Sequence, residues 1–143
     1  MAIANLHETL LSYTLRKNEL AREIAEFQSQ KTLALASQGD LQHLKSAREH
    51  EVRDYFKTLY KDDAELQEDY KDYTLIPEFE EEINKIAAEF QNQLEELTAW
   101  ETALDSQITT DSAELEEVNA YMESIKSMLQ SNIQEDFNYG LNG

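Results

Sequence analysis

Apolar residues recur along most of this chain at alternating steps of three and four. The first series is Ile3, Leu6, Leu10, Tyr13, Leu20, Ile24 and Phe27. This spacing is that of the a and d positions of a heptad repeat, which puts apolar side chains on one narrow face of a helix. The pattern therefore predicts a long amphipathic helix from residue 3 onward.

Two further series follow with the same spacing. The second is Val52, Phe56, Leu59, Leu66, Tyr70 and Tyr73, with Asp63 in a missing slot. The third is Phe79, Ile83, Ile86, Phe90, Leu97, Trp100 and Leu104, and it continues to Ile133. Together the series predict two helical arms, over residues 3–73 and 77–139, within a single helical domain spanning residues 1–143.

The only proline of the chain stands between these arms. The residue before a proline is pushed out of the α region, so Ile76 should lie outside a helix. Pro77 fits the first helical turn, where its missing N–H costs nothing. Glu78 and Glu80 then lie at the positive end of the helix dipole. We expect an all-α fold, an antiparallel helical coiled-coil hairpin with its turn at about residues 74–77.

In both arms the apolar pattern weakens at a second place, near residues 37–40 and 109–112, which leaves another arrangement open. Gly39 could end one helix and Asp40 begin the next, and Asp111 with Glu114 resembles a capping box. If both arms break there, the chain forms an up-down four-helix bundle with helices at about 3–36, 41–73, 78–109 and 112–139. The narrow apolar stripe favours the hairpin.

A hairpin that turns near residue 75 also predicts which residues face one another. It places Arg48 near Glu101, Arg53 within reach of Glu96, and Lys57 near Leu94. Each of these pairs brings a basic side chain of the first arm onto the more acidic second arm.

The charge of the chain is large and unevenly distributed. The net charge is −18. Residues 1–61 carry nine Lys/Arg and eight Asp/Glu, net +1, whereas residues 62–143 carry three and 22, net −19. Such a balance argues against nucleic acid and anionic membrane as partners, because both repel it. It favours a basic protein partner.

Chemistry-bearing residues are sparse. The 143 residues include three glycines and no cysteine, which excludes disulfides and thiolate chemistry. No catalytic or phosphate-binding motif is present, so we expect no enzyme and no cofactor. His43 and His50 are seven apart on one helix face, and His7 stands alone. Asp40 and Ala47 occupy the places where a di-iron bundle needs glutamate, so we expect no metal site.

Several apolar residues lie outside the heptad series. Leu11, Leu15, Tyr121 and Met128 flank it near the two chain ends and predict a self-association surface. Tyr55 and Tyr60 predict a partner contact near the turn. We expect a structural or assembly protein that forms homo-oligomers, such as a filament subunit. The second interpretation is an acidic helical chaperone or adaptor for a basic amphipathic partner.

The layout across the whole chain resembles helical filament subunits of the flagellin and type III secretion kind. Those are cysteine-free chains whose terminal amphipathic helices pack into a polymer, and the resemblance implies an exported bacterial structural protein. The stretch SMLQSNIQEDFNYG, residues 127–140, is similar to the tails of uncharacterised coiled-coil proteins of gut bacteria. No Sec signal and no apolar membrane span is apparent. We expect a cytoplasmic protein, or one exported without a Sec signal peptide.

Overall fold

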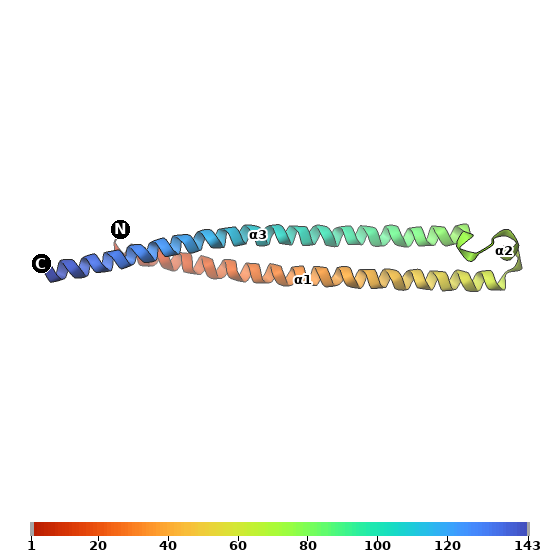
Figure 1. Cartoon of the computed structure of the whole chain (residues 1–143), viewed down its shortest axis with the longest axis horizontal. Helices are drawn as coiled ribbons and strands as arrows, with labels where there is room; N and C mark the ends of the chain where they lie inside the picture. Colours follow the sequence, from red (N-terminus) through yellow and green to blue (C-terminus); the bar gives the residue numbers. More distant parts are fainter. Residues whose placement is uncertain (1, 143) are drawn as a thin grey trace. The chain divides into compact units, whose positions relative to one another are not determined.

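The chain folds as α-helices. The computed structural model describes residues 2–142, and the side chains of residues 2–136. Its elements are α1 (Ile3–Asp62), α2 (Ala64–Asp69), the 3-10 helix η1 (Tyr73–Leu75) and α3 (Pro77–Asn142) (Figure 1). No strand occurs among the described residues, and the two long helices α1 and α3 pack together. The expected all-α class is confirmed.

The pair comprises two compact units, and unit 1 contains Met1–Lys31 and Ala103–Gly143. In each unit, the faces along which the two helix segments meet are here called the seam. The core of unit 1 is a row of apolar side chains in its seam. Leu6 packs against Ile125 and Leu129, while Leu20, further along α1, packs against Val118 and Met122. The later residue of α1 contacts the earlier residues of α3, so the two segments are antiparallel.

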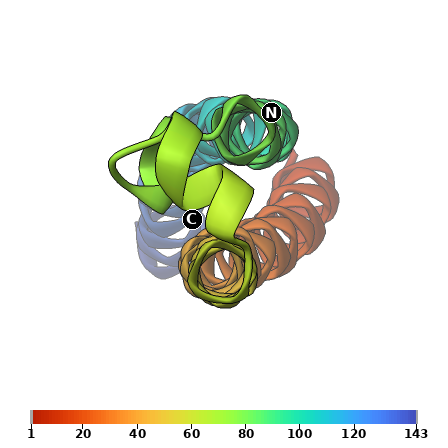
Figure 2. The ribbon, with the colours of Figure 1, turned by 90° about the vertical axis from the view of Figure 1, so that its right-hand side faces the viewer.

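Unit 2 contains Thr32–Thr102 and is closed by an aromatic cluster. Phe56 of α1, Ile76 and Phe79 are buried together, and the rings of Phe56 and Phe79 meet edge to face with centroids 5.5 Å apart. Tyr70 and Tyr73 of the connection pack against them. Figure 2 shows the connecting segment folded across the adjacent ends of α1 and α3. Phe56, Phe79, Tyr70 and Tyr73 therefore belong to the core of this unit.

The first helix ends earlier than predicted, at Asp62 rather than at residue 73. Asp63 has an extended backbone, and its carboxylate accepts hydrogen bonds from the N–H groups of Glu65 and Leu66. Aspartate is a preferred N-cap because it satisfies N–H groups that a helix start leaves unpaired. The prediction that Asp63 merely fills a slot in a continuing heptad was wrong: it caps α2.

The prediction for the proline is confirmed. Pro77 is the first residue of α3, Ile76 is extended, and Glu78 and Glu80 occupy the first turn. The connection is nonetheless longer than the expected turn at residues 74–77. It spans 63–76, because α2 and η1 each begin at an aspartate N-cap, Asp63 and Asp72 respectively.

Neither long helix breaks where the alternative arrangement requires it. α1 passes through residues 37–40 and α3 through 109–112 without interruption. Gly39 has no positive φ, so it is a helical residue at a cost of about 1 kcal/mol relative to alanine. Tertiary contacts compensate, since the neighbouring Gln38 donates a hydrogen bond to Glu101 across the seam. The helix of the second arm reaches Asn142 rather than residue 139.

The longer connection changes which residues face each other in unit 2. Arg48 lies 3.4 Å from Glu89, not beside Glu101. The guanidinium of Arg53 stands 5.8 Å from the ring centroid of Phe79, and the ammonium of Lys57 stands 5.7 Å from that of Tyr73. The three predicted pairings were wrong by more than a heptad, because they assumed that α1 ran on to the turn.

Candidate interaction surfaces

An ion pair spans the two helices of unit 1. Arg16 donates from Nε and Nη2 to the two carboxylate oxygens of Glu114, at 2.8 and 2.9 Å. Glu19, one turn along α1, lies 3.2 Å from the same guanidinium. The hydrogen bonds that Arg16 donates to Glu114, and then to Glu19, raise the pKa of Arg16. A paired fork of this kind fixes both distance and direction between the helices.

Two carboxyl groups meet in the same seam. Asp111 is buried at 7% exposure, and its Oδ2 has no hydrogen-bond partner among the described residues. The hydrogen bond with Asp111 raises the pKa of Glu23, partial burial adds to this rise, and Arg16 opposes it. The interaction favours the protonated form of Glu23. The stabilising effect of this interaction is thus complete below the ordinary pKa of a glutamate, and it is lost as pH rises through the raised pKa of Glu23.

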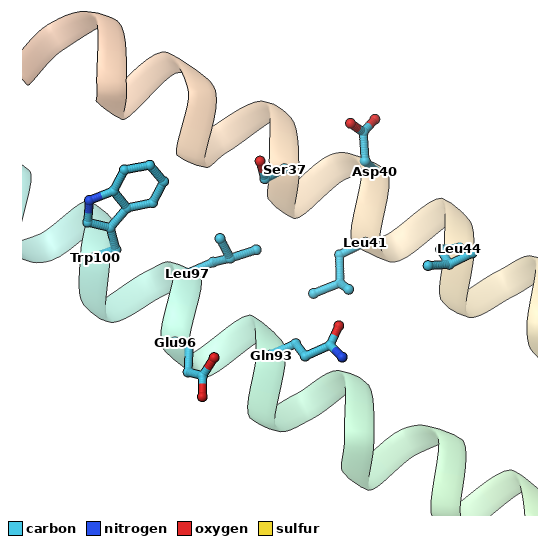
Figure 3. A pocket seen from close by; sticks show the side chains of 8 residues that line it. All are labelled: Ser37, Asp40, Leu41, Leu44, Gln93, Glu96, Leu97 and Trp100. Carbon is cyan, nitrogen blue, oxygen red and sulfur yellow. The ribbon is translucent and has the colours of Figure 1, made fainter. Parts of the chain in front are cut away.

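A groove lies beside the seam of unit 2, with a volume of about 480 Å³. The groove is lined by Ser37, Asp40, Leu41, Leu44, Gln93, Glu96, Leu97 and Trp100. In Figure 3, Leu41 and Leu97 point toward each other between the helices, and the indole of Trp100 reaches toward α1. Asp40 and Glu96 stand at the outer margins, so the groove has an apolar floor and an acidic rim.

The four residues predicted for self-association all lie in unit 1, on two different faces. Leu11 and Leu15 are 61% and 63% exposed. Leu15 follows the buried Leu6 by nine residues, and Leu11 precedes the buried Leu20 by nine. Nine residues are two and a half turns at about 3.6 residues per turn. Leu11 and Leu15 therefore form an outer face of α1, directed away from its seam.

Tyr121 and Met128 instead border the seam on α3. Tyr121 stacks on Tyr13 of α1 with ring centroids 5.6 Å apart, and it donates its hydroxyl to Glu117 at 3.1 Å. That hydrogen bond raises the pKa of Tyr121. Met128 is half exposed and precedes the buried Leu129. The four residues therefore do not form the one surface that the sequence predicted. Leu11 and Leu15 form an outer face of α1, and Tyr121 and Met128 lie at the edge of the seam on α3.

The two tyrosines predicted to contact a partner differ in their surroundings. Tyr55 is exposed, and its ring meets that of Phe56 edge to face. Tyr60 packs against the aromatic cluster and donates its hydroxyl to the carbonyl oxygen of Tyr70 at 2.9 Å. Tyr60 therefore holds the connection in place, and Tyr55 is the more accessible of the two.

The histidines do not come together with acidic residues at a metal-like site. His50 lies 3.5 Å from Asp54 on an exposed face of α1. Within residues 2–142, no group of three His, Asp or Glu side chains is arranged to hold a metal ion. Nor does this part of the chain contain a helix that is both long and apolar enough to cross a membrane.

The sequence analysis predicted neither the polar residues within the seams nor the groove. Glu101 and Asp111 occupy heptad positions between Leu97, Leu104 and Leu115, but the apolar series placed Trp100 in the slot at 101. The signal was present in the spacing, because steps of four and three from Leu97 lead to Glu101 and then Leu104. Trp100 is instead 37% exposed at the groove.

Comparisons with known proteins add no further identification. No protein-family model matches this chain, and the searches of curated proteins and of solved structures found no match.

Proposed function

We propose that this chain is a structural, self-assembling protein: a helical hairpin that associates with further copies through Leu11, Leu15, Tyr121 and Met128. The exposed outer face of Leu11 and Leu15 is the observation that carries the proposal. Two leucines at i and i+4 are neighbours on a helix surface, so they form one continuous apolar patch. Among the side chains that the structure describes, none of unit 1 covers them, since both lie two and a half turns from fully buried seam residues.

The size of these patches predicts a weak contact. Burying the exposed part of one such side chain contributes about 1 kcal/mol. Because the four residues lie on two faces, a copy that uses both has neighbours on two sides, and its two contacts, of four side chains each, together contribute about 8 kcal/mol. Placing that copy costs at least about 4 kcal/mol. The remainder corresponds to a dissociation constant of about 1 mM. A pair of chains should dissociate readily, whereas a polymer that repeats the contact gains from it at every subunit.

The net charge sets the response of this contact to salt. Two chains of charge −18 repel one another, and added salt screens that repulsion. Because the contact itself is apolar, self-association should strengthen as ionic strength rises.

Sedimentation velocity over a concentration series up to about 1 mM, at low and high salt, tests the proposal. The wild type should show a rising average mass, more steeply at high salt. The double variant Leu11→Gln/Leu15→Gln should remain monomeric, because it removes the outer face without touching the seam. Leu33→Gln/Leu35→Gln, at two exposed leucines of unit 2, is the matched control and should behave as the wild type. A strictly monomeric wild type throughout the series, or equal association of both double variants, refutes the proposal.

A further inference from the structure

The groove of unit 2 presents two matching stripes of side chains. Ser37, Leu41 and Leu44 come from α1 at steps of four and three, and Gln93, Leu97 and Trp100 come from α3 at the same steps. Steps of four and three keep side chains on one helix face. The two stripes together form the kind of trough into which a third helix lays its own apolar stripe, with anchors at i, i+4 and i+7.

We infer that this groove docks a basic amphipathic helix of a partner protein. The groove is made of residues of unit 2, none of which belongs to the proposed self-association surface, so the inference is independent of that proposal. Its apolar floor is already partly solvent-exposed: Leu44 is 54% exposed and Trp100 37%. A volume of about 480 Å³ lies within the range of about 300–1,000 Å³ that small binding sites occupy, enough for a few anchoring side chains.

Charge identifies the class of occupant. Residues 32–44 and 86–102 contain no Lys or Arg, and they contain five acidic residues: Asp40, Glu89, Glu95, Glu96 and Glu101. Lys45, just beyond Leu44, is paired with Glu49 at 3.8 Å, and Glu89 is paired with Arg48. Asp40 and Glu96, at the rim, make no hydrogen bond or ion pair with another described residue. The rim therefore offers free carboxylates to a cationic helix.

The tryptophan strengthens this assignment. An exposed indole face attracts Lys or Arg side chains by about 0.5–1 kcal/mol. A neutral or acidic helix gains neither this contact nor the ion pairs at the rim. A second copy of this chain would bring its own negative charge into the groove, which argues against it as the occupant.

Trp100 is also the only tryptophan of the chain, so its fluorescence reports on the groove alone. The probe is a helical peptide of about 15 residues made of leucine and lysine, with leucine at i, i+4 and i+7, which contains no aromatic residue. Titration into the full-length protein should shift the Trp100 emission to shorter wavelength and saturate. Raising the salt concentration should weaken binding, which is the opposite of the response expected for self-association.

Matched variants locate the site. Glu96→Gln and Asp40→Asn should each weaken binding about two- to fivefold, because each removes one exposed charge pair. Glu95→Gln, beside Glu96 but hydrogen-bonded to Gln91 and absent from the lining, should leave binding unchanged. Leu44→Gln should weaken binding about tenfold through the lost apolar contact.

Three results would overturn the inference. One is the absence of any emission change up to millimolar peptide, and another is equal binding of the analogue in which every lysine is glutamate. The third is an emission shift that follows the concentration of the protein without peptide, because a second copy would then fill the groove. The first two leave the assay of Leu11 and Leu15 unaffected, and the third predicts that the variant Leu11→Gln/Leu15→Gln still self-associates.

Discussion

Replacement of Asp111 by leucine should stabilise the protein, although it removes a native hydrogen bond. Asp111 is buried in the seam of unit 1, and its Oδ2 is unpaired among the described residues. A buried polar atom without a partner costs about 1–3 kcal/mol.

The magnitude follows from four contributions. Removing the unpaired oxygen gains about 2 kcal/mol. The new leucine continues the apolar series between Ile108 and Leu115 and gains about another 2 kcal/mol through burial. The lost hydrogen bond to Glu23 costs about 1 kcal/mol, and the larger side chain costs about 1 kcal/mol through crowding. We expect a net stabilisation of about 2 kcal/mol.

Urea unfolding followed by circular dichroism measures this difference. The midpoint should rise for Asp111→Leu while the m-value stays constant, since the surface exposed on unfolding barely changes. Glu116→Leu is the matched control, because the same substitution at this exposed position of α3 should stay within about 0.5 kcal/mol of the wild type. If Asp111→Leu is no more stable than the wild type while the control behaves as expected, the unpaired oxygen costs nothing, and our account of the seam is wrong.

Three further changes follow from the contacts described above. Glu23→Gln imitates the protonated form that Asp111 favours, so its stability relative to the wild type should increase as pH rises from about 4 to 7; a constant difference across that range in urea unfolding contradicts the assignment. Tyr60→Phe should lose about 1 kcal/mol with its hydrogen bond, whereas Tyr55→Phe should lose nothing; equal losses would contradict the different surroundings of the two rings. Cysteines at Gln38 and Glu101, whose side chains meet at 3.0 Å, should crosslink within one chain on non-reducing electrophoresis. Cysteines at Leu59 and Leu94, which a turn at residues 74–77 would bring close together, should not crosslink, because Leu94 lies beside Leu41 and Lys45.

The helices themselves could be predicted from the sequence. The heptad spacing shows which residues face a neighbour, because burying an apolar stripe is the main source of stability for such a helix. The proline marked the start of α3 correctly, since its effect on its own backbone and on Ile76 is local. Features that depend only on neighbouring residues are thus predictable from the order of the amino acids.

The polar contacts and the register could not be predicted in that way. Asp63 and Asp111 are both acidic residues at heptad slots, yet one caps a short helix and the other is buried in the seam. What distinguishes them is the residue across the seam, roughly ninety positions away for Asp111, and local propensity carries no information about it. The error at Asp63 then shifted every predicted pairing in unit 2, since the length of the connection sets the register.

The ion pairs across the unit 1 seam favour one alignment of its two helix segments. An apolar heptad repeat does not distinguish its own register from one shifted by seven residues, because leucine meets leucine in either. Arg16 does distinguish them: it meets Glu114 in the structure, but a slip of seven would bring it level with Gln107 or Tyr121. Lys31, 2.7 Å from Asp105, would likewise meet Thr98 or Ser112. If each lost pair costs about 0.7 kcal/mol, two disfavour the slipped register about tenfold. The polar positions of the seam thus cost some stability and favour a single alignment of the two helix segments.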